Sequence, residues 1–177
     1  MEKKEVITLE KIITIKRLKQ EYEDIRSHPM VGLGIIVQLT NPDNIWEWTC
    51  SIKGAKGTSY EKGSFVVKIK FSEYYPRVAP EICFKTPIYH ASVNSENRIR
   101  PLGYVPVWRD NYNIREALTD LYGLFFGPHK VIFGIEKITE YVTERAVYEE
   151  KINYFTKKYA ISWDDIEYSS QDWNFTT

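Results

Sequence analysis

The sequence predicts a single α+β domain with an N-terminal helix, a four-stranded antiparallel meander, a long ordered loop, a central helix and C-terminal helices. Three observations predict it. Apolar residues recur every three or four positions over residues 9–26, four short segments then resemble strands, and helical spacing returns after residue 113. Strands joined by short links favour antiparallel pairing, with one face of the sheet packed on a helix.

The first helix is predicted for residues 9–26, and Pro29 ends it because the residue before a proline avoids the helical conformation. Its basic residues between positions 11 and 19 alternate with Ile and Leu, so we interpret them as a solvated helix face and expect no nucleic-acid partner. The apolar stripe of this helix consists of Ile12, Ile15, Leu18, Tyr22 and Ile25.

Four strands are predicted at residues 34–40, 46–53, 65–71 and 81–86. The second shows the clearest alternation, because Trp48, Cys50 and Ile52 are apolar and their neighbours are polar, which places them on one face. Residues 87–112 show no periodicity. Their aromatic and proline content favours an ordered loop, and a loop of this length is usually functional.

A second helix is predicted to begin at Asn113, with Glu116 three residues later completing a capping box, and to end before Gly127. Its expected buried stripe is Ile114, Ala117, Leu118, Leu121 and Phe125. Two further helices are predicted over residues 136–146 and 148–159. The remaining residues, 161–177, are polar and acidic but carry several aromatic side chains.

Composition limits the classes of function. The chain has 177 residues, which suits one domain, with 24 basic and 24 acidic residues and therefore no global basic field for nucleic acid or an anionic membrane. No apolar run reaches the length of a membrane span. Cys50 and Cys83 are too few for a disulfide framework or a zinc site, and both are expected to be buried and structural. We expect a cytoplasmic, intracellular protein with no cofactor, no metal and no membrane partner.

Several segments resemble the ubiquitin-conjugating enzyme (UBC) fold family. These are Trp48 with the strand that leads to Gly54, residues 59–65, the Tyr-Pro block at residues 71–80, residues 88–90 and Trp108 with the helix after it. The resemblance covers residues 12–160, so residues 1–11 and 161–177 are expected to be extensions. It implies a fold whose active members carry ubiquitin on a cysteine as a thioester and transfer it to an amine, because a thiolate is both nucleophilic and a good leaving group.

Compared position by position, the resemblance implies that this chain has lost the catalytic apparatus. His90 matches the histidine of the family's His-Pro-Asn turn, Ala91 replaces the proline and Ser92 replaces the asparagine. Arg100 occupies the position of the catalytic cysteine, and Ile132 that of the acidic or polar gate residue. A guanidinium cannot form a thioester, so a pseudoenzyme is expected.

The surface that meets RING-type ligases in the family is altered as well. Arg77 stands where a hydrophobic anchor is common, and residues 109–111 replace a small Ser-Pro-Ala loop. Interface hot spots are buried apolar or aromatic anchors, so charges at these positions should weaken that partnership.

Some alternatives stay open at this stage. His90 and Ser92 could form a serine nucleophile with its base, although no orienting carboxylate is evident. Arg100 could pair with an acidic partner, or lie solvated or paired with Glu96 or Asp110 within the chain. The C-terminal segment could dock on a partner or on its own domain; its candidate partner-binding residues are Trp163, Trp173 and Phe175.

Two non-catalytic functions are therefore expected. The first is a UBC-like binding or scaffold module that binds ubiquitin or an active conjugating enzyme, as ubiquitin-conjugating enzyme variants do. The alternative is a structural subunit of a large assembly with no ubiquitin role. Variants that stay in the ubiquitin pathway usually shorten the C-terminal helices, whereas the matching pattern here persists to Ala160, which lends weight to the alternative.

Overall fold

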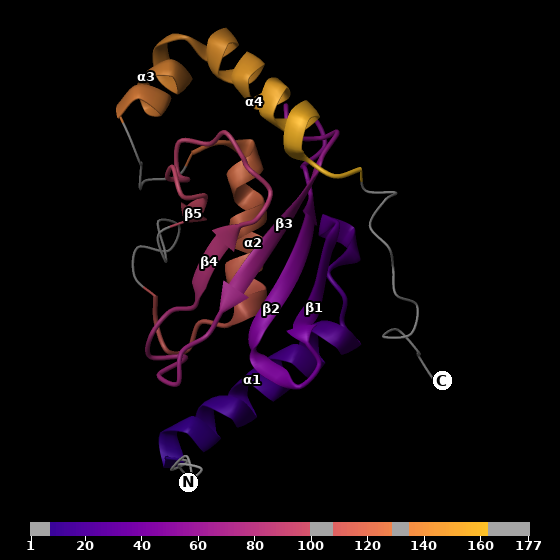
Figure 1. Cartoon of the computed structure of the whole chain (residues 1–177), viewed down its shortest axis with the longest axis vertical. Helices are drawn as coiled ribbons and strands as arrows, with labels where there is room; N and C mark the ends of the chain where they lie inside the picture. The colour runs from indigo at the N-terminus through magenta and orange to yellow at the C-terminus, as the bar shows by residue number, and fades with distance from the viewer. Residues whose placement is uncertain (1–7, 100–107, 129–134, 163–177) are drawn as a thin grey trace, which may run out of the picture.

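The structure is a computed structural model that describes residues 8–99, 108–128 and 135–162. The elements follow the predicted order with one added strand (Figure 1). They are α1 (Leu9–Ser27), the 3-10 turn η1 (Val31–Leu33), β1 (Ile35–Asn41), β2 (Asn44–Lys53), β3 (Ser64–Lys70), β4 (Glu81–Phe84), β5 (Arg98–Ile99), α2 (Ile114–Gly123), the 3-10 turn η2 (Leu124–Phe126), α3 (Ile135–Thr143) and α4 (Arg145–Tyr159).

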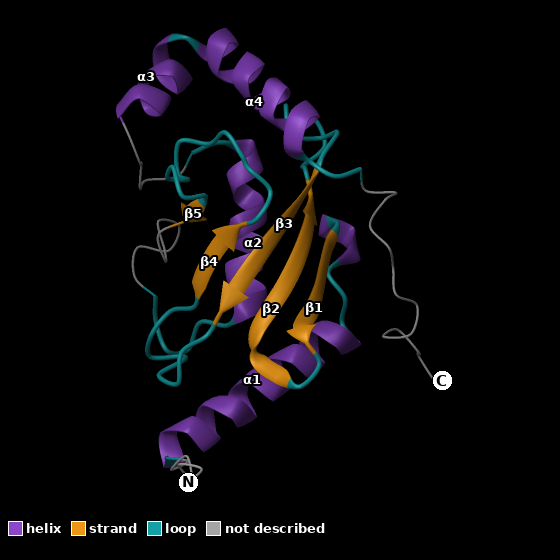
Figure 2. Cartoon of the chain, viewed as in Figure 1, coloured by secondary structure: helices purple, strands orange, loops and turns teal. Residues whose placement is uncertain are grey.

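The strands form one antiparallel sheet in the order β1-β2-β3-β4-β5, which confirms the meander and adds β5 to its edge. β5 has two residues, too few for alternation to reveal it in the sequence. Figure 2 shows α2 running behind the sheet, α1 at one end of the molecule and the α3–α4 pair at the other.

One core joins the inward side of the sheet to α2. Trp48, Cys50 and Ile52 of β2 are fully buried, as the alternation predicts. The stripe predicted for the second helix is buried throughout, and its last member, Phe125, lies in η2 because α2 tightens into a 3-10 turn after Gly123. The predicted capping box is present: Asn113 accepts a hydrogen bond from the Glu116 amide at 3.0 Å, and Glu116 accepts one from the Asn113 amide at 2.9 Å.

The stripe predicted for α1 is partly wrong. Leu18 and Ile25 are buried, but Ile12 is 53% exposed, and two polar residues, Thr14 and Glu21, take inward positions. Both are buried because distant parts of the chain give them hydrogen bonds. Polar side chains can occupy a core when such partners are present.

Both C-terminal helices begin slightly earlier than predicted, and the break between them is at Glu144. The first also ends earlier, whereas the second ends at Tyr159 as predicted. After α4, Ile161 pairs with Ser64 at the start of β3 through two main-chain hydrogen bonds of 2.9 and 3.1 Å. Among the described helices, none is long and apolar enough to cross a membrane.

Candidate functional site

The turn at residues 90–93 lies deep in the domain. His90, Ala91, Ser92 and Val93 are each at most 3% exposed. The amide of Ser92 donates to Nδ1 of His90 at 2.9 Å, and Nε2 of His90 lies 3.1 Å from the carbonyl oxygen of Leu124. Because Nδ1 accepts, the proton belongs on Nε2, which donates to Leu124. This pattern holds the imidazole in one neutral tautomer.

The serine of the turn is not placed to act as a nucleophile. His90 contacts the main-chain nitrogen of Ser92, and both ring nitrogens are engaged with main-chain groups. The hydroxyl of Ser92 is buried and has no hydrogen-bond partner among the described residues. The structure therefore contradicts the alternative of a Ser–His pair, since His90 does not contact this hydroxyl.

The α3–α4 pair holds the turn from the other side. The hydroxyl of Tyr148 in α4 accepts a hydrogen bond from the Ala91 amide at 2.9 Å. The ammonium of Lys137 in α3 donates to the carbonyl oxygens of Val93 at 3.0 Å and His90 at 3.4 Å. Burial raises the pKa of Tyr148 and lowers that of Lys137, as expected for groups taken out of water.

A second connection runs through Tyr89, the residue before the turn. Its hydroxyl donates to Glu140 of α3 at 2.6 Å, and Lys151 of α4 donates to the other oxygen of the same carboxylate. The hydrogen bonds from Lys151 and Tyr89 hold the pKa of Glu140 below its usual value. Lys137 lies 5.2 Å from the centre of the Tyr89 ring, within the range of a cation–π contact. The turn at residues 90–93 and the α3–α4 pair therefore form one packed unit.

Sequence reasoning missed Lys137, Glu140 and Tyr148. The spacing of Lys137 and Glu140 places them on one helix face, which is the only signal available. Nothing in the sequence indicates that this face meets residues 89–93, because the contacts span more than 40 positions.

A small cavity of about 210 Å³ lies beside the turn. Its lining includes Tyr60, Phe125 and Tyr148. Arg145, which also lines it, stacks 4.2 Å from the Tyr141 ring and pairs with Glu149 at 2.6 Å. Within the described part of the chain, no three His, Cys, Asp or Glu residues gather as a metal site would require.

The two cysteines lie in the sheet. Cys50 is fully buried in β2, as predicted, and burial raises the pKa of its thiol. Cys83 of β4 is only partly buried, which corrects the expectation for it. The reason is strand alternation: its neighbour Phe84 faces the core, so Cys83 points to the other side of the sheet. Its sulfur lies 3.6 and 3.8 Å from the carbonyl oxygens of Phe84 and Glu96.

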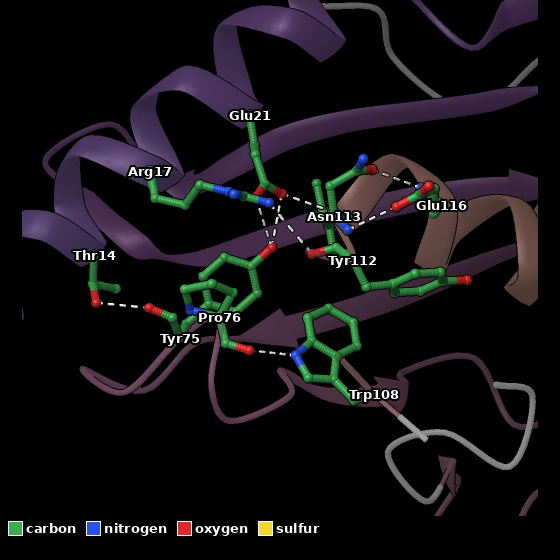
Figure 3. Close-up of polar contacts among 10 residues, drawn as sticks. Thr14, Arg17, Glu21, Tyr75, Pro76, Trp108, Tyr112, Asn113 and Glu116 are labelled. Atoms are coloured by element: carbon green, nitrogen blue, oxygen red, sulfur yellow. Dashed lines mark hydrogen bonds and ion pairs between the residues drawn. The ribbon is translucent and has the colours of Figure 1, made fainter. Parts of the chain in front are cut away.

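A buried polar cluster fixes the Tyr-Pro block against α1 and α2 (Figure 3). The hydroxyl of Tyr75 lies 2.9 and 2.8 Å from the two carboxylate oxygens of Glu21, which also accepts the Ile114 amide at 2.8 Å and the guanidinium of Arg17. The indole of Trp108 donates to the Pro76 carbonyl. This cluster is structural, since every group in it has a partner within the fold.

Arg77 and Asp110, two positions where the resemblance implies a change in the ligase-facing surface, lie beside α1. Arg77 pairs with Glu10 at 2.7 Å, and both side chains are more than half exposed. Asp110 is exposed on the neighbouring loop.

Of the predicted site residues, the structure brings together His90, Ala91 and Ser92. Five others lie outside the described residues: Arg100, Ile132, Trp163, Trp173 and Phe175.

Comparison with known proteins agrees with this architecture. The family model for ubiquitin-conjugating enzyme matches residues 17–156. A curated protein of Arabidopsis thaliana described as "Probable ubiquitin-conjugating enzyme E2 31" is 32% identical over 121 residues, which cover 68% of this chain and 79% of that protein. The match includes the sheet, the turn at His90 and the helices after it, so this chain belongs to the ubiquitin-conjugating enzyme family.

Proposed function

We propose that this chain is a non-catalytic member of the family that acts as a protein-binding or scaffold module. The observation that carries the proposal is the turn at His90. Its imidazole is neutral and engaged on both nitrogens, and the hydroxyl of Ser92, at the position of the family's asparagine, has no hydrogen-bond partner among the described residues. Because this hydroxyl is buried, it does not reach an accessible position at which an oxyanion would develop.

The cysteines support the same proposal. A thioester carrier needs an accessible thiolate. The sequence contains only Cys50 and Cys83, and Arg100 occupies the position matched to the catalytic cysteine. Cys50 is shielded from solvent and its thiolate is disfavoured. Cys83 precedes the turn and lies in β4, which pairs with β3 and β5 in the sheet. It is therefore not at the position matched to the catalytic cysteine.

The proposed partners are ubiquitin or an active conjugating enzyme, since these are the proteins that the family's surfaces meet. Their binding would need a fixed surface, and the hydrogen bonds between the turn and the α3–α4 pair supply one. Both cysteines are free thiols, which suits the reducing cytoplasm that we propose as the setting.

The test is a thioester assay with ubiquitin-activating enzyme, ATP and labelled ubiquitin, read on non-reducing gels. An active conjugating enzyme serves as positive control, and the Cys83→Ser variant controls for adventitious labelling. We expect no thiol-sensitive adduct on the wild-type chain. An adduct that Cys83→Ser abolishes would show that the chain carries ubiquitin on Cys83, and the proposal would be wrong. Binding of ubiquitin and of an active conjugating enzyme is then measured by NMR titration up to about 1 mM, the weak end of specific affinities.

A structural subunit of a large assembly is the second candidate. The observation that favours it is the exposure of large apolar side chains on α3, where Ile135 is 83% and Val142 is 70% exposed. Exposed apolar patches indicate contact with another surface. Purification of the tagged chain from native extracts distinguishes the two. One large complex in fixed ratio without ubiquitin machinery favours the subunit, and recovery of ubiquitin or a conjugating enzyme favours the binding module.

A further inference from the structure

A groove of about 380 Å³ lies between η1, the start of β1, the end of β2 and the loop that joins β2 to β3. We call it the η1 groove. Figure 1 shows that η1 and the end of α4 lie at the same end of β1 and β2. The lining residues that matter below are Val31, Leu33, Gly34, Lys53, Lys56 and Tyr122.

Part of the η1 groove is apolar and open to solvent. Val31 is 69% exposed. Leu33 and Tyr122, which line the groove with it, are half-buried. An aromatic side chain placed against these residues would remove apolar area from water, which is favourable.

The rim of the η1 groove is basic. Lys53, Lys56 and Glu61 line it, and Lys62, which follows Glu61, is exposed. The carboxylate of Glu61 accepts a hydrogen bond from the Gly57 amide at 2.8 Å. Within the described ranges, neither Lys56 nor Lys62 forms an ion pair. The rim therefore favours an acidic occupant.

The chain leaves α4 beside this groove. Ile161 and Ser64 exchange two main-chain hydrogen bonds, of 2.9 and 3.1 Å, in an antiparallel bridge. Because the bridge is antiparallel, the residues after Ile161 are directed past Gly63 toward Lys62. The C-terminal segment is therefore aimed at the basic rim.

The register of the sheet shows how far the segment has to reach. Ser64 is opposite Lys53, and the Lys53 amide donates to the Gly34 carbonyl at 2.9 Å. With neighbouring strands about 4.8 Å apart, Lys53 lies about 10 Å and Gly34 about 14 Å from Ile161. A fully extended chain of the length of residues 163–177 spans about 50 Å, so the whole η1 groove is within its reach.

The composition of residues 163–177 complements the η1 groove. This segment lies outside the described residues, and its sequence contains no Lys, Arg or His. Its carboxylates belong to Asp164, Asp165, Glu167 and Asp172, and its aromatic residues are Trp163, Tyr168, Trp173 and Phe175.

We propose that residues 163–177 bind in the η1 groove of the same chain. Their carboxylates pair with Lys56 and Lys62, and an aromatic side chain beyond position 166 packs on Val31. Trp163 is not that anchor, because the two residues after Ile161 span about 7 Å at most. The inference goes beyond the proposed function, since it concerns a contact within the chain and holds whether or not the chain carries ubiquitin.

Covalent attachment makes weak contacts sufficient. An exposed ion pair contributes little by itself, and the η1 groove offers only a few such pairs. A segment joined to its site by a short linker has an effective concentration in the millimolar range, so contacts too weak to hold a free peptide keep a tethered segment bound.

The test measures paramagnetic broadening of amide signals by NMR in the full chain. A nitroxide spin label is attached to the Ser170→Cys variant in a Cys83→Ser background. Cys50 is 0% exposed and therefore does not react with the label. Reduction of the nitroxide supplies the reference spectrum.

The amides of Val31 and Gly32 report on the η1 groove, and those of Glu73 and Tyr74, beside the start of α1, report on a distant surface. We expect strong broadening at Val31 and Gly32 and little at Glu73 and Tyr74. Weak broadening of similar size at both surfaces would show that the segment stays unbound, and would overturn the proposal.

The double variant Lys56→Glu/Lys62→Glu tests the charged contacts. It should lower the equilibrium constant of docking about tenfold, because two attractions become repulsions of similar size. The matched control is Lys16→Glu/Lys19→Glu, which makes the same change in net charge on exposed residues of α1 and should keep the broadening at Val31. Equal loss in both variants would show that the segment senses only net charge, and the proposal would be wrong.

Val31→Ser tests the apolar contact without adding a charge. It should weaken the broadening at Gly32, and unchanged broadening would overturn the part of the proposal that places an aromatic side chain on Val31. All four exposed lysines and Val31 tolerate polar groups where they stand, and a well-dispersed spectrum confirms that each variant is folded.

A second copy of the chain is the competing source of the segment. A mixed sample, with the spin label on one set of molecules and ¹⁵N on the other, distinguishes the two. Broadening at Val31 in the mixed sample would show that the segment binds a neighbouring molecule and would overturn docking within one chain. Failure here is separable from failure of the proposed function, since neither the label nor the lysine variants bear on whether Cys83 forms a thioester.

Discussion

Replacing Tyr148 with Phe removes a single oxygen atom from the contact between α4 and the turn. Tyr148 is 2% exposed, and its hydroxyl is the acceptor for the Ala91 amide at 2.9 Å. Ala91 is 0% exposed, so bulk water cannot replace the lost acceptor directly. The Tyr148→Phe variant therefore leaves a buried N–H group unsatisfied while the aromatic packing stays the same.

The expected cost follows from that N–H group. A buried donor without a partner costs about 1–3 kcal/mol. The low end of that range applies if a water molecule enters the adjacent cavity of about 210 Å³, which Tyr148 lines, and takes the place of the hydroxyl. For a domain of this size the loss corresponds to a fall in Tm of about 2–12 °C.

Urea unfolding followed by tryptophan fluorescence measures the change in the free energy of unfolding. Tyr154→Phe is the matched control, because Tyr154 is on the same helix and is 57% exposed, and its hydroxyl accepts a hydrogen bond from exposed Lys158 at 3.1 Å. We expect the control to change stability by less than about 0.5 kcal/mol. If Tyr148→Phe also costs less than about 0.5 kcal/mol, Ala91 does not depend on this hydroxyl and the reasoning fails.

Three further changes test the same unit and the helix that supports it. Lys137→Met should lower the free energy of unfolding by about 1–3 kcal/mol and speed amide hydrogen exchange at residues 90–93, because two carbonyl oxygens lose their donor. Unchanged exchange, measured by mass spectrometry, would contradict this prediction. Glu140→Gln should lower the free energy of unfolding at pH 7. The hydrogen bonds from Lys151 and Tyr89 hold the pKa of Glu140 below its usual value in the folded state. Its contribution is therefore present above the unfolded-state pKa and is lost as the pH falls through the folded pKa, so the stability difference between variant and wild type should shrink toward acid pH. Asn113→Ala should cost about 1 kcal/mol in urea unfolding through loss of the cap on α2, and Asn113→Asp, which retains a capping oxygen, should recover most of it.

The features predicted correctly from the sequence are those with a local signal. The cap at Asn113 needs only Glu116 three residues away, and the burial of Trp48, Cys50 and Ile52 follows from alternation within one strand. Local signals fail where the partner is distant in the chain. Thr14 is inside because its hydroxyl reaches Tyr75, 61 positions away, and Glu21 because it accepts the Ile114 amide, 93 positions away.

The candidate site was predictable in part for the same reason. The identities of His90, Ala91 and Ser92 can be read from the sequence, and so can the absence of cysteine at position 100. The side chains that hold the turn in place cannot be read from the sequence, because Lys137 and Tyr148 are ordinary residues for helices with a polar and an apolar face. Only the docking of the α3–α4 pair gives them their roles.

Those supports change what the C-terminal helices imply about function. Main-chain groups at Ala91, Val93 and His90 are buried and are paired with side chains of α3 and α4. Removal of the helix pair would take Tyr148 and Ile152 out of the hydrophobic core and exchange these hydrogen bonds for hydrogen bonds to water. The lost burial would cost a few kcal/mol in a domain whose whole stability is about 5–15 kcal/mol. Stability alone therefore accounts for the presence of these helices. Their presence argues neither for catalysis nor for a role in an assembly, and the choice between the two non-catalytic functions depends on the exposed surfaces of α1 and α3.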